Sequence, residues 1–510
     1  MSGVVFAFSV LGGMAAAFAA APPVPGPAVE LQAPAGAAGT RCVWDFDYTA
    51  DLSKCRGISF AFRCDDLEQF SGFFVYFQCG TGWYCTQFSP DFSKQWDRLY
   101  VLKTSAWPEG KPSGWDNVSR LRIAGVRSGK AVGTVCSLSD VCAIASDAAH
   151  EDPAPYRAEI RRMPSKSPEF RGFWCHQPWG LDAQHDWDKS AKFMKDHGFN
   201  ALIVNPCWGP SAAYPSAILR PTAEVAEKGD ALDACLKACR QNGLECHAWK
   251  VCWNMGSRTT QQTHDEMVAD GRTQMRFDGR PNDRWLCPSD TRNLRMEIES
   301  MVELASRGVD GIHFDYIRYL DKDSCFCNHC RRRFEKVLGH EVANWPGDVR
   351  SVSEYERKWA DFRVANISRL VRKVSERVRS EYPKVKISAA VWHQPGGVDY
   401  RQIGQDWPTW CEKGWLDFVC PMDYVASAQV LSGRIDFQKP FAGKVKMRPG
   451  LGLSCWYRQD ALGVRLARQI MTVRSKGLDG FVVFNLDEAA LLALPEVLLG
   501  PTSSRAKLPR

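Results

Sequence analysis

The spacing of hydrophobic and polar residues changes once along the chain. Between residues 41 and 147, short segments in which apolar and polar residues alternate are separated by turn residues. Many short alternating segments with turn punctuation predict an antiparallel β-sandwich. The expected strands span residues 43–48, 57–63, 72–78, 83–88, 98–103, 119–126 and 132–136.

From residue 169 onward, eight short apolar runs alternate with amphipathic helical stretches. The runs lie at 172–175, 201–205, 246–251, 311–315, 386–391, 418–421, 447–451 and 480–485. Helices are expected at 188–197, 231–242, 294–307, 355–382 and 461–476, and the sixth helix of the series is hard to find. Glycines that suit left-handed helix ends precede several runs, namely Gly198, Gly243, Gly308 and Gly477. This alternation is typical of a parallel (β/α)8 barrel.

The predicted fold is therefore an α/β TIM (β/α)8 barrel preceded by an all-β, jelly-roll-like sandwich. The expected organisation is a signal peptide (1–21), a Pro/Ala/Gly linker (22–40), the sandwich (41–150), a second linker (151–168), the barrel (169–500) and a tail (501–510). Two long loops, 254–285 and 320–353, follow the third and fourth runs. Both fall on the C-terminal face, where such barrels place their chemistry.

The first residues have the composition of an export signal. Residues 4–21 are apolar or small throughout, and Ala17-Phe18-Ala19 offers a small-x-small cleavage site, although no Lys or Arg precedes Arg41. Richness in Ala and Gly argues against a retained membrane span, and no later segment reaches spanning length without charges. We expect an exported protein that is periplasmic, on the cell surface or extracellular.

Charge and composition narrow the class of partner. Among 510 residues, 65 Lys and Arg against 58 Asp and Glu leave a net charge of +7. This excess is too small and too diffuse for a nucleic-acid-binding face. The 19 Trp against 13 Tyr are more suggestive, because indole faces are good platforms for flat apolar ligand surfaces.

The fourth apolar run ends in a carboxylate that the alternation directs into the barrel. In residues 311–316 the large apolar side chains must face the helices, so His313 and Asp315 point inward. An inward carboxylate at the end of a strand costs desolvation energy unless it is paired or used. We expect Asp315 to be catalytic; the alternative is a salt bridge to a neighbour such as Arg318 or Lys250.

Two later strands also end near acids. Asp423 follows the sixth run, within residues 420–424, and is the second catalytic candidate. The alternative for Asp423 is that it caps the segment that follows it. After the eighth run, Asp487 is expected to cap a helix that begins near Ala489, and Glu488 competes for the catalytic role.

Two carboxylates that face each other across a barrel mouth suit cleavage of a glycosidic bond. One carboxyl is protonated to release the leaving oxygen, and the other is charged to attack the anomeric carbon or to activate water. Aromatic and polar side chains near the strand ends could stack on a sugar or bond to it. The expected substrate-binding residues are Trp208, Lys250, His313, Trp392, His393, Trp456, Asn485 and Glu488.

The loop after the fourth run contains a C-x-C-x-x-C sequence, formed by Cys325, Cys327 and Cys330. Three thiolates this close can converge on one Zn²⁺, whose tetrahedron takes a fourth ligand. Cys287 is the candidate for that ligand, and His329 is the alternative. Four thiolates would make the zinc structural, whereas disulfide bonding in an exported protein is the competing interpretation.

Several segments of the barrel region resemble a known family. They span residues 169–174, 308–319, 359–366, 405–407, 414–417 and 421–424, in the family's order. The family is the glycosyl-hydrolase-like group that includes lytic enzymes acting on denuded peptidoglycan glycan strands. The resemblance implies a TIM-barrel glycoside hydrolase with Asp315 in the family's most characteristic motif.

Three further likenesses bear on roles. Acids after the fourth and sixth strands resemble the retaining clan of α-galactosidases, which implies Asp315 as nucleophile and Asp423 as acid/base. The cysteine cluster is similar to one that binds structural zinc in some barrel-type β-galactosidases. The N-terminal sandwich resembles an accessory carbohydrate-binding domain, by analogy of fold.

The predicted function is an exported, retaining glycoside hydrolase that acts on a poly- or oligosaccharide without a catalytic cofactor. The alternative is a non-catalytic glycan-binding protein built on the same barrel. A barrel metallohydrolase is disfavoured, because the strand ends lack the sets of His and Asp ligands that such enzymes use.

Overall fold

The computed structural model describes residues 5–6, 28–91, 93–103, 106–128, 132–145, 154–181, 186–453 and 462–509. The predicted signal peptide lies outside these residues, apart from the two-residue strand β1 (Val5–Phe6). Trp456 and residues 22–27 of the first predicted linker also lie outside them. None of the described helices combines the length and the apolar character that crossing a membrane requires.

The N-terminal part consists of two sheets. One has the order β1-β3-β9-β5-β6-β8 and the other β2-β10-β4-β7. All neighbouring strands in them are antiparallel except β1 and β3. The strands are β2 (Val29–Ala33), β3 (Arg41–Ala50), β4 (Cys55–Cys64), β5 (Phe70–Cys79), β6 (Gly82–Phe88), β7 (Asp97–Leu102), β8 (Trp107–Glu109), β9 (Val118–Arg127) and β10 (Thr134–Ala145).

The two N-terminal sheets share one hydrophobic core. Phe62 of β4 meets Phe73 of β5 edge to face with ring centroids 5.1 Å apart, so the contact joins one sheet to the other. Alternation along each strand places such rings on one face, which is the reason the short alternating segments identified this part as all-β.

The C-terminal part is built on a parallel sheet with the order β21-β20-β19-β18-β15-β12-β11-β23-β22. Every pair along this path is parallel. The strands are β11 (Phe170–Cys175), β12 (Ala201–Trp208), β15 (Glu245–Val251), β18 (Gly311–Asp315), β19 (Lys386–Val391), β20 (Phe418–Pro421), β21 (Lys446–Met447), β22 (Gly450–Gly452) and β23 (Gly480–Phe484).

The two strands at the ends of this sheet order, β21 and β22, follow each other directly in the chain. β21 pairs with β20 and β22 pairs with β23, and only Arg448 and Pro449 separate β21 from β22. A bridge between Met422 and Gly450 also links the two sides. The seventh run of the sequence is thus one strand split between its two neighbours, and the parallel barrel-type arrangement predicted from the alternation is present.

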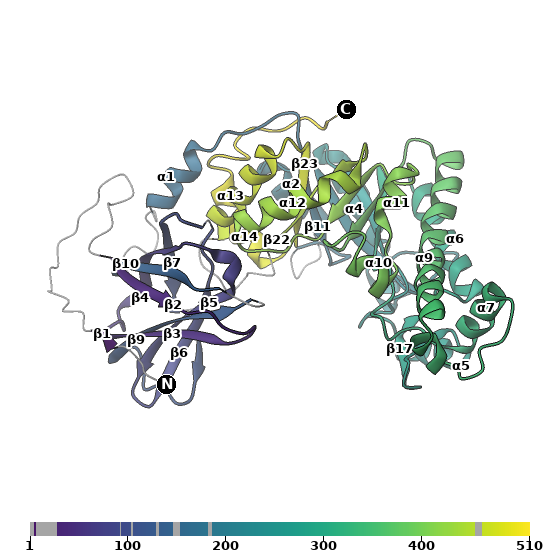
Figure 1. The fold of residues 1–510 in the computed structure, drawn as a ribbon. Helices are drawn as coiled ribbons and strands as arrows, with labels where there is room; N and C mark the ends of the chain where they lie inside the picture. The colour runs from purple at the N-terminus through teal and green to yellow at the C-terminus, as the bar shows by residue number, and fades with distance from the viewer. Residues whose placement is uncertain are drawn as a thin grey trace.

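Helices cover the outside of the parallel sheet (Figure 1). Several of them begin after an aspartate cap, namely Asp186, Asp230, Asp290, Asp406 and Asp487, each of which accepts a hydrogen bond from a backbone N–H of the first turn. The cap predicted at Asp487 is therefore confirmed. The longer helices are α2 (Trp187–Asp196), α4 (Ala231–Asn242), α6 (Thr291–Ser306), α7 (Asn328–Leu338), α9 (Ser353–Glu381), α12 (Ala428–Ala442), α13 (Leu462–Ser475) and α14 (Glu488–Val497).

The two predicted long loops contain short elements of their own, among them α5 (Gln261–Ala269) and α7. Three other segments also differ from the expectation. Helix α12 is the sixth helix that the pattern did not reveal, because Gly433 and Pro440 lie inside it and Phe437 is exposed, which blurs its apolar stripe. Strand β2 lies in the first predicted linker, where pairing with β10 orders it. Helix α1 (Ala154–Arg162) lies in the second predicted linker.

An ion cluster joins the two parts of the chain. The guanidinium of Arg468, on α13, donates hydrogen bonds to three carboxylates. They belong to Asp91, to Asp97 (Nη1 to Oδ1, 3.2 Å) and to Glu159 of α1 (Nε to Oε1, 2.8 Å). Ser427, the N-cap of α12, donates to the carbonyl of Asp91 at 2.7 Å. The N-terminal sheets therefore lie beside α13 and the start of α12 (Figure 1).

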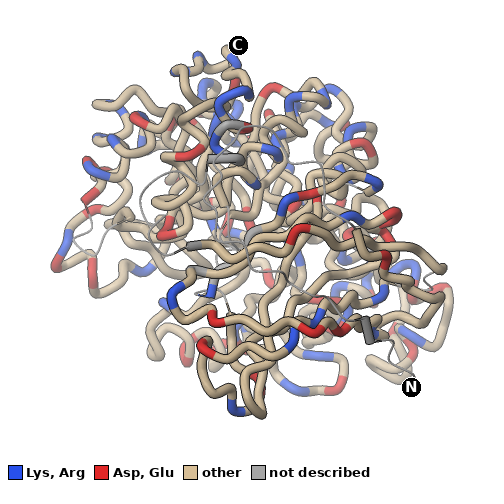
Figure 2. Tube along the Cα trace, turned by 90° about the vertical axis from the view of Figure 1, so that its left-hand side faces the viewer, with Lys and Arg blue, Asp and Glu red and all other residues tan. Residues whose placement is uncertain are grey.

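Charged residues do not gather by sign. On the side of the molecule shown in Figure 2, Lys and Arg are interspersed with Asp and Glu along the chain. This distribution agrees with the diffuse excess of positive charge in the sequence.

Candidate active site

Asp315 is the last residue of β18 and lies at the carboxyl edge of the parallel strands. Its side chain is 6% exposed. Ile312 and Phe314 pack in the layer between strands and helices, as the alternation predicted. Tyr316 has a φ of 52°, a left-handed conformation that bulky residues rarely adopt, so the chain turns sharply directly after the carboxylate.

No salt bridge to the Asp315 carboxylate is present among the described residues. Its Oδ1 accepts a hydrogen bond from the backbone N–H of Tyr316 at 2.6 Å. Lys250 pairs with Glu297 at 3.2 Å, and Arg318 donates to backbone carbonyls. Burial raises the pKa of Asp315 to about 6, and the Tyr316 N–H and the Arg318 charge offset part of that rise. The ion pair weighed as the alternative for Asp315 is therefore not formed.

Asp423 follows β20 and is fully buried. Its Oδ1 accepts a hydrogen bond from Gln438 Nε2 at 2.8 Å and lies 3.8 Å from a guanidinium nitrogen of Arg434. Its Oδ2 has no hydrogen-bond partner in the described part of the chain. Burial raises the pKa of Asp423 to about 7, against the effects of Gln438 and Arg434. Ser427, and not Asp423, caps the following helix.

His313 and Lys250 are enclosed by protein. Nε2 of His313 accepts a hydrogen bond from the indole N–H of Trp174 at 3.0 Å, and Nδ1 lies 2.8 Å from Ser388 Oγ. Burial holds the pKa of His313 well below its usual range, so the ring is neutral. Lys250 donates to the carbonyl of Gly209 at 2.7 Å. Neither side chain has exposed surface, so both brace the strand ends from within.

Three expected contact residues are accessible at the rim. Trp392 is 36% exposed, and its ring lies nearly parallel to that of His393 with centroids 6.2 Å apart. Burial and the Arg434 charge lower the pKa of His393 to about 4, so its imidazole is neutral. Glu488 is exposed in the first turn of α14.

The remaining expected contact residues are mostly buried. Trp208 is 3% exposed, and the Arg258 guanidinium lies over its ring. Asn485 is 9% exposed, and its Oδ1 accepts a hydrogen bond from the backbone N–H of His176 at 3.0 Å.

A cavity of about 450 Å³ opens beside Asp423. Its walls come from the loop after β19, with His393 and Pro395, and from α12, with Gly433, Arg434 and Phe437. Arg434 both lines this cavity and faces Asp423. Through Arg434, the cavity wall that includes His393 therefore adjoins the buried acid.

Sequence reasoning missed three residues of this region. Gln438 and Arg434 lie on α12. Its apolar residues do not recur with a clear helical period, so no signal in the sequence pointed to these two side chains. Asp399 is fully buried, and burial raises its pKa to about 6. The only sequence signal for Asp399 is its position shortly after the fifth apolar run, residues 386–391.

Arg318 is held among aromatic rings. Its guanidinium lies 5.4, 4.8 and 5.5 Å from the ring centroids of Trp285, Tyr316 and Trp392. Stacking of this kind is favourable for a guanidinium that is partly removed from water. The cation is thereby fixed near Asp315 without forming a salt bridge to it.

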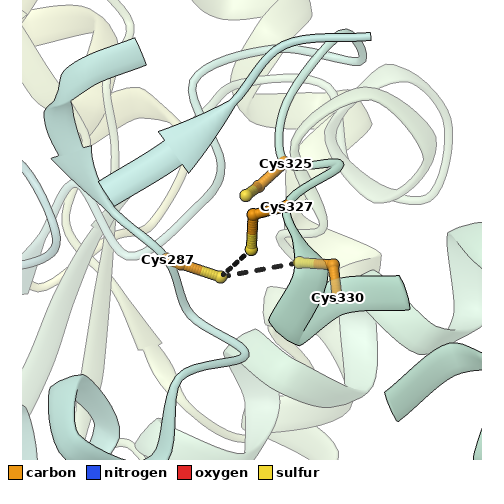
Figure 3. Close-up of side chains that lie close together, drawn as sticks. All are labelled: Cys287, Cys325, Cys327 and Cys330. Carbon is orange, nitrogen blue, oxygen red and sulfur yellow. Dashed lines mark hydrogen bonds between the residues drawn. The ribbon is translucent and has the colours of Figure 1, made fainter. Parts of the chain in front are cut away.

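The four predicted cysteine ligands converge (Figure 3). Their sulfur atoms all lie within 4.8 Å of one another, and Cys287 Sγ is 3.4 Å from Cys327 Sγ and 3.5 Å from Cys330 Sγ. The backbone N–H of Met275 donates to Cys325 Sγ at 3.3 Å. The two long loops after β15 and β18 thus meet at these thiols.

The geometry of this cluster fits a tetrahedral metal better than disulfides. Zn–S bonds of about 2.3 Å give tetrahedron edges of about 3.8 Å, close to the observed sulfur separations. The described cysteines are all free. His329 was the other candidate for the fourth ligand, but its Nε2 faces Asp290 Oδ2 at 3.5 Å. The residues present therefore suit one closed four-thiolate site.

Comparison with known proteins identifies the barrel region. The family model described as glycosyl hydrolase-like 10 matches residues 169–449. Glycosyl hydrolase DigH of Escherichia coli (strain K12) is 26% identical over 259 residues, which cover 44% of this chain and 55% of that protein. Its counterpart in Shigella flexneri matches equally. The chain thus spans about half the length of the curated relatives it matches.

A solved structure shares the fold. The PgaB (BpsB) glycoside hydrolase domain from Bordetella bronchiseptica superimposes with a TM-score of 0.53 at 15% identity, covering 65% of this chain and 98% of that domain. At this level of identity the likeness concerns the fold alone.

Proposed function

Because the chain belongs to the glycosyl hydrolase-like 10 family, we propose that it is a glycoside hydrolase that cleaves O-glycosidic bonds in a poly- or oligosaccharide. Asp315 is the nucleophile and Asp423 the general acid/base of a retaining reaction. Trp392, His393 and Glu488 contact the sugar, and Trp208, Asn485 and Trp456 are further substrate-binding residues. Lys250 and His313 position the strand ends that carry these groups.

In this reaction the Asp315 carboxylate attacks the anomeric carbon while Asp423 gives its proton to the leaving oxygen. The resulting glycosyl ester on Asp315 is hydrolysed by water, from which Asp423 takes a proton. The pKa values fit these roles, because Asp423, at about 7, keeps its proton at a pH where Asp315, at about 6, is mostly charged.

The observation that carries the proposal is the state of Asp315. A carboxylate that is buried at the end of a barrel strand and makes no salt bridge to any described residue is costly to retain for structure alone. Its position at the C-terminal edge is where barrels of this type place catalytic groups.

One observation favours a second candidate, a non-catalytic glycan-binding protein. The Asp423 side chain has no exposed surface, whereas a general acid has to reach the leaving oxygen of the substrate. In the hydrolase, Arg434 and Gln438 therefore have to yield space when substrate binds.

The experiment is a panel of polysaccharides, peptidoglycan glycan strands included, incubated with the wild-type protein and with Asp315→Asn. The hydrolase gives new reducing ends with one substrate for the wild type only. Binding to a glycan of the panel without new reducing ends would support the second candidate.

We also propose that Cys287, Cys325, Cys327 and Cys330 hold one structural Zn²⁺, with no catalytic cofactor elsewhere. Four thiolates leave no open coordination position for water, so such a metal would tie the loops after β15 and β18 together and take no part in the reaction.

The setting we propose is outside the cytoplasm, with residues 1–21 as the export signal. The N-terminal sheets act as an accessory carbohydrate-binding domain. Support for this role comes from their fixed position beside α13 and the start of α12, near the loop that carries Asp423.

A further inference from the structure

The cavity beside Asp423 contains a cation with unused hydrogen-bonding capacity. The Arg434 side chain is 27% exposed, and its nearest anionic partner is Asp423 at 3.8 Å, beyond hydrogen-bond distance. Among the described residues, Arg434 makes no hydrogen bond. A guanidinium offers five N–H donors in a planar fork, which matches a carboxylate in two parallel bonds.

The charge of Arg434 is not balanced inside the cavity. The other ionisable side chain in its wall is His393, whose imidazole is neutral, and the remaining wall residues carry no charge. When Asp423 holds the proton that its proposed role requires, no ionised carboxylate in the cavity faces Arg434. The cavity therefore presents a net positive charge to a ligand.

The rest of the wall suits a sugar ring. Phe437 is 53% exposed and offers an aromatic surface, and the neutral imidazole of His393 can both donate and accept a hydrogen bond. A cavity of about 450 Å³ is within the range that binds small organic ligands.

We propose that this cavity binds an acidic sugar unit of the substrate, with its carboxylate paired to Arg434 and its ring against Phe437. The inference rests on the proposed function and specifies it, because it makes carboxylate-bearing glycans the substrate class. Gln438 donates to both the carbonyl of His393 and Asp423, so the cavity wall is directly connected to the proposed acid.

Gly433 gives a way to close the cavity without changing its charge. A Cβ added at Gly433 meets no atom within 4 Å, and its φ lies outside the left-handed region. Gly433 lies within α12, where leucine is a better helix former than glycine. Gly433→Leu therefore fills space in the cavity while leaving the helix intact.

The test compares an acidic polysaccharide, polygalacturonate, with the same polymer after chemical reduction of its carboxyl groups. Binding is measured by calorimetry with full-length Asp315→Asn protein, so that hydrolysis plays no part. We expect the carboxylated polymer to bind at least tenfold more tightly than the reduced polymer, because a hydrogen bond to a charged group typically changes affinity by this much. Arg434→Ala and Gly433→Leu should each abolish this preference, and Arg434→Lys should restore part of it.

Arg295, an exposed residue of α6, supplies the matched control, because Arg295→Ala removes an equal charge away from the cavity. Equal binding of the two polymers, or a preference that survives Arg434→Ala, would overturn the proposal. Because binding is read without turnover, this failure is distinct from failure of the hydrolase assignment, which the reducing-end assay reports.

Discussion

Gln438 donates a hydrogen bond from Nε2 to Asp423 Oδ1 at 2.8 Å, and both residues are fully buried. This bond stabilises the ionised form of Asp423 and so lowers its pKa. In Gln438→Leu we expect the pKa of Asp423 to rise further, which moves the alkaline limb of the pH dependence of kcat/KM to higher pH. An alkaline limb that stays in place would show that another group donates the proton.

The wild-type protein should show a bell-shaped pH dependence of kcat/KM. Burial raises the pKa of Asp315 to about 6, and activity needs its ionised form, so activity rises as pH increases through about 6. Burial raises the pKa of Asp423 to about 7, and activity needs its protonated form, so activity falls above about 7. A plateau that extends to pH 9 would contradict the assignment of Asp423.

Arg468→Ala should weaken the joint between the two parts of the chain. It leaves Asp91, Asp97 and Glu159 without their cation, and we expect a loss of about 3 kcal/mol in the free energy of unfolding at pH 7.5. Burial and Asp91 raise the pKa of Asp97 to about 6, so Asp97 takes up a proton as pH falls below that value. The loss should therefore be smaller at pH 5.

Chemical denaturation at both pH values measures this difference. Arg295→Ala serves as the control and should change the free energy of unfolding by less than about 0.5 kcal/mol at either pH. An Arg468→Ala loss of the same size at pH 5 and pH 7.5 would show that repulsion among the three carboxylates is not its cause.

Metal analysis tests the thiolate cluster. The purified protein should contain one zinc per chain, and Cys287→Ser should lose it, with a lower Tm and faster proteolysis within residues 254–287 and 320–353. Cys411→Ser, which alters a buried cysteine of α11 (Trp407–Glu412), should keep the metal. A zinc content unaffected by Cys287→Ser would exclude this site.

The sequence predicted the parallel strands and most of the long helices, because those elements have a strong local signal. The strand ending at Asp315 alternates cleanly, and Gly198, Gly243, Gly308 and Gly477 all adopt the positive φ expected at the ends of helices. Helix α12 lacked such a signal, since the polar Gln438 lies within its buried stripe whereas the apolar Phe437 is exposed. That omission also hid Arg434 and Gln438, the two side chains that contact Asp423.

The candidate site was harder to predict than the fold. Whether a site residue is exposed or enclosed depends on side chains from distant parts of the chain that meet inside the barrel. Nothing in the sequence near Lys250 indicates that Glu297 of α6 pairs with it. Likewise, the enclosure of His313 depends on Trp174 of β11 and Ser388 of β19, which are distant in the chain. The cysteine cluster was an easier case, since short spacing already brings three of its members together.

Turnover of Asp315→Asn is the most direct test of the account. Asparagine keeps an oxygen that accepts the hydrogen bond from the Tyr316 N–H, and it removes a negative charge that burial disfavours. The Tm at pH 8 should therefore not fall. On the glycan that the wild type cleaves, kcat should drop by about a thousandfold or more, while Asp436→Asn, an exposed change on α12, should leave it unchanged. A folded Asp315→Asn protein that retains kcat within tenfold of the wild type would contradict the central claim.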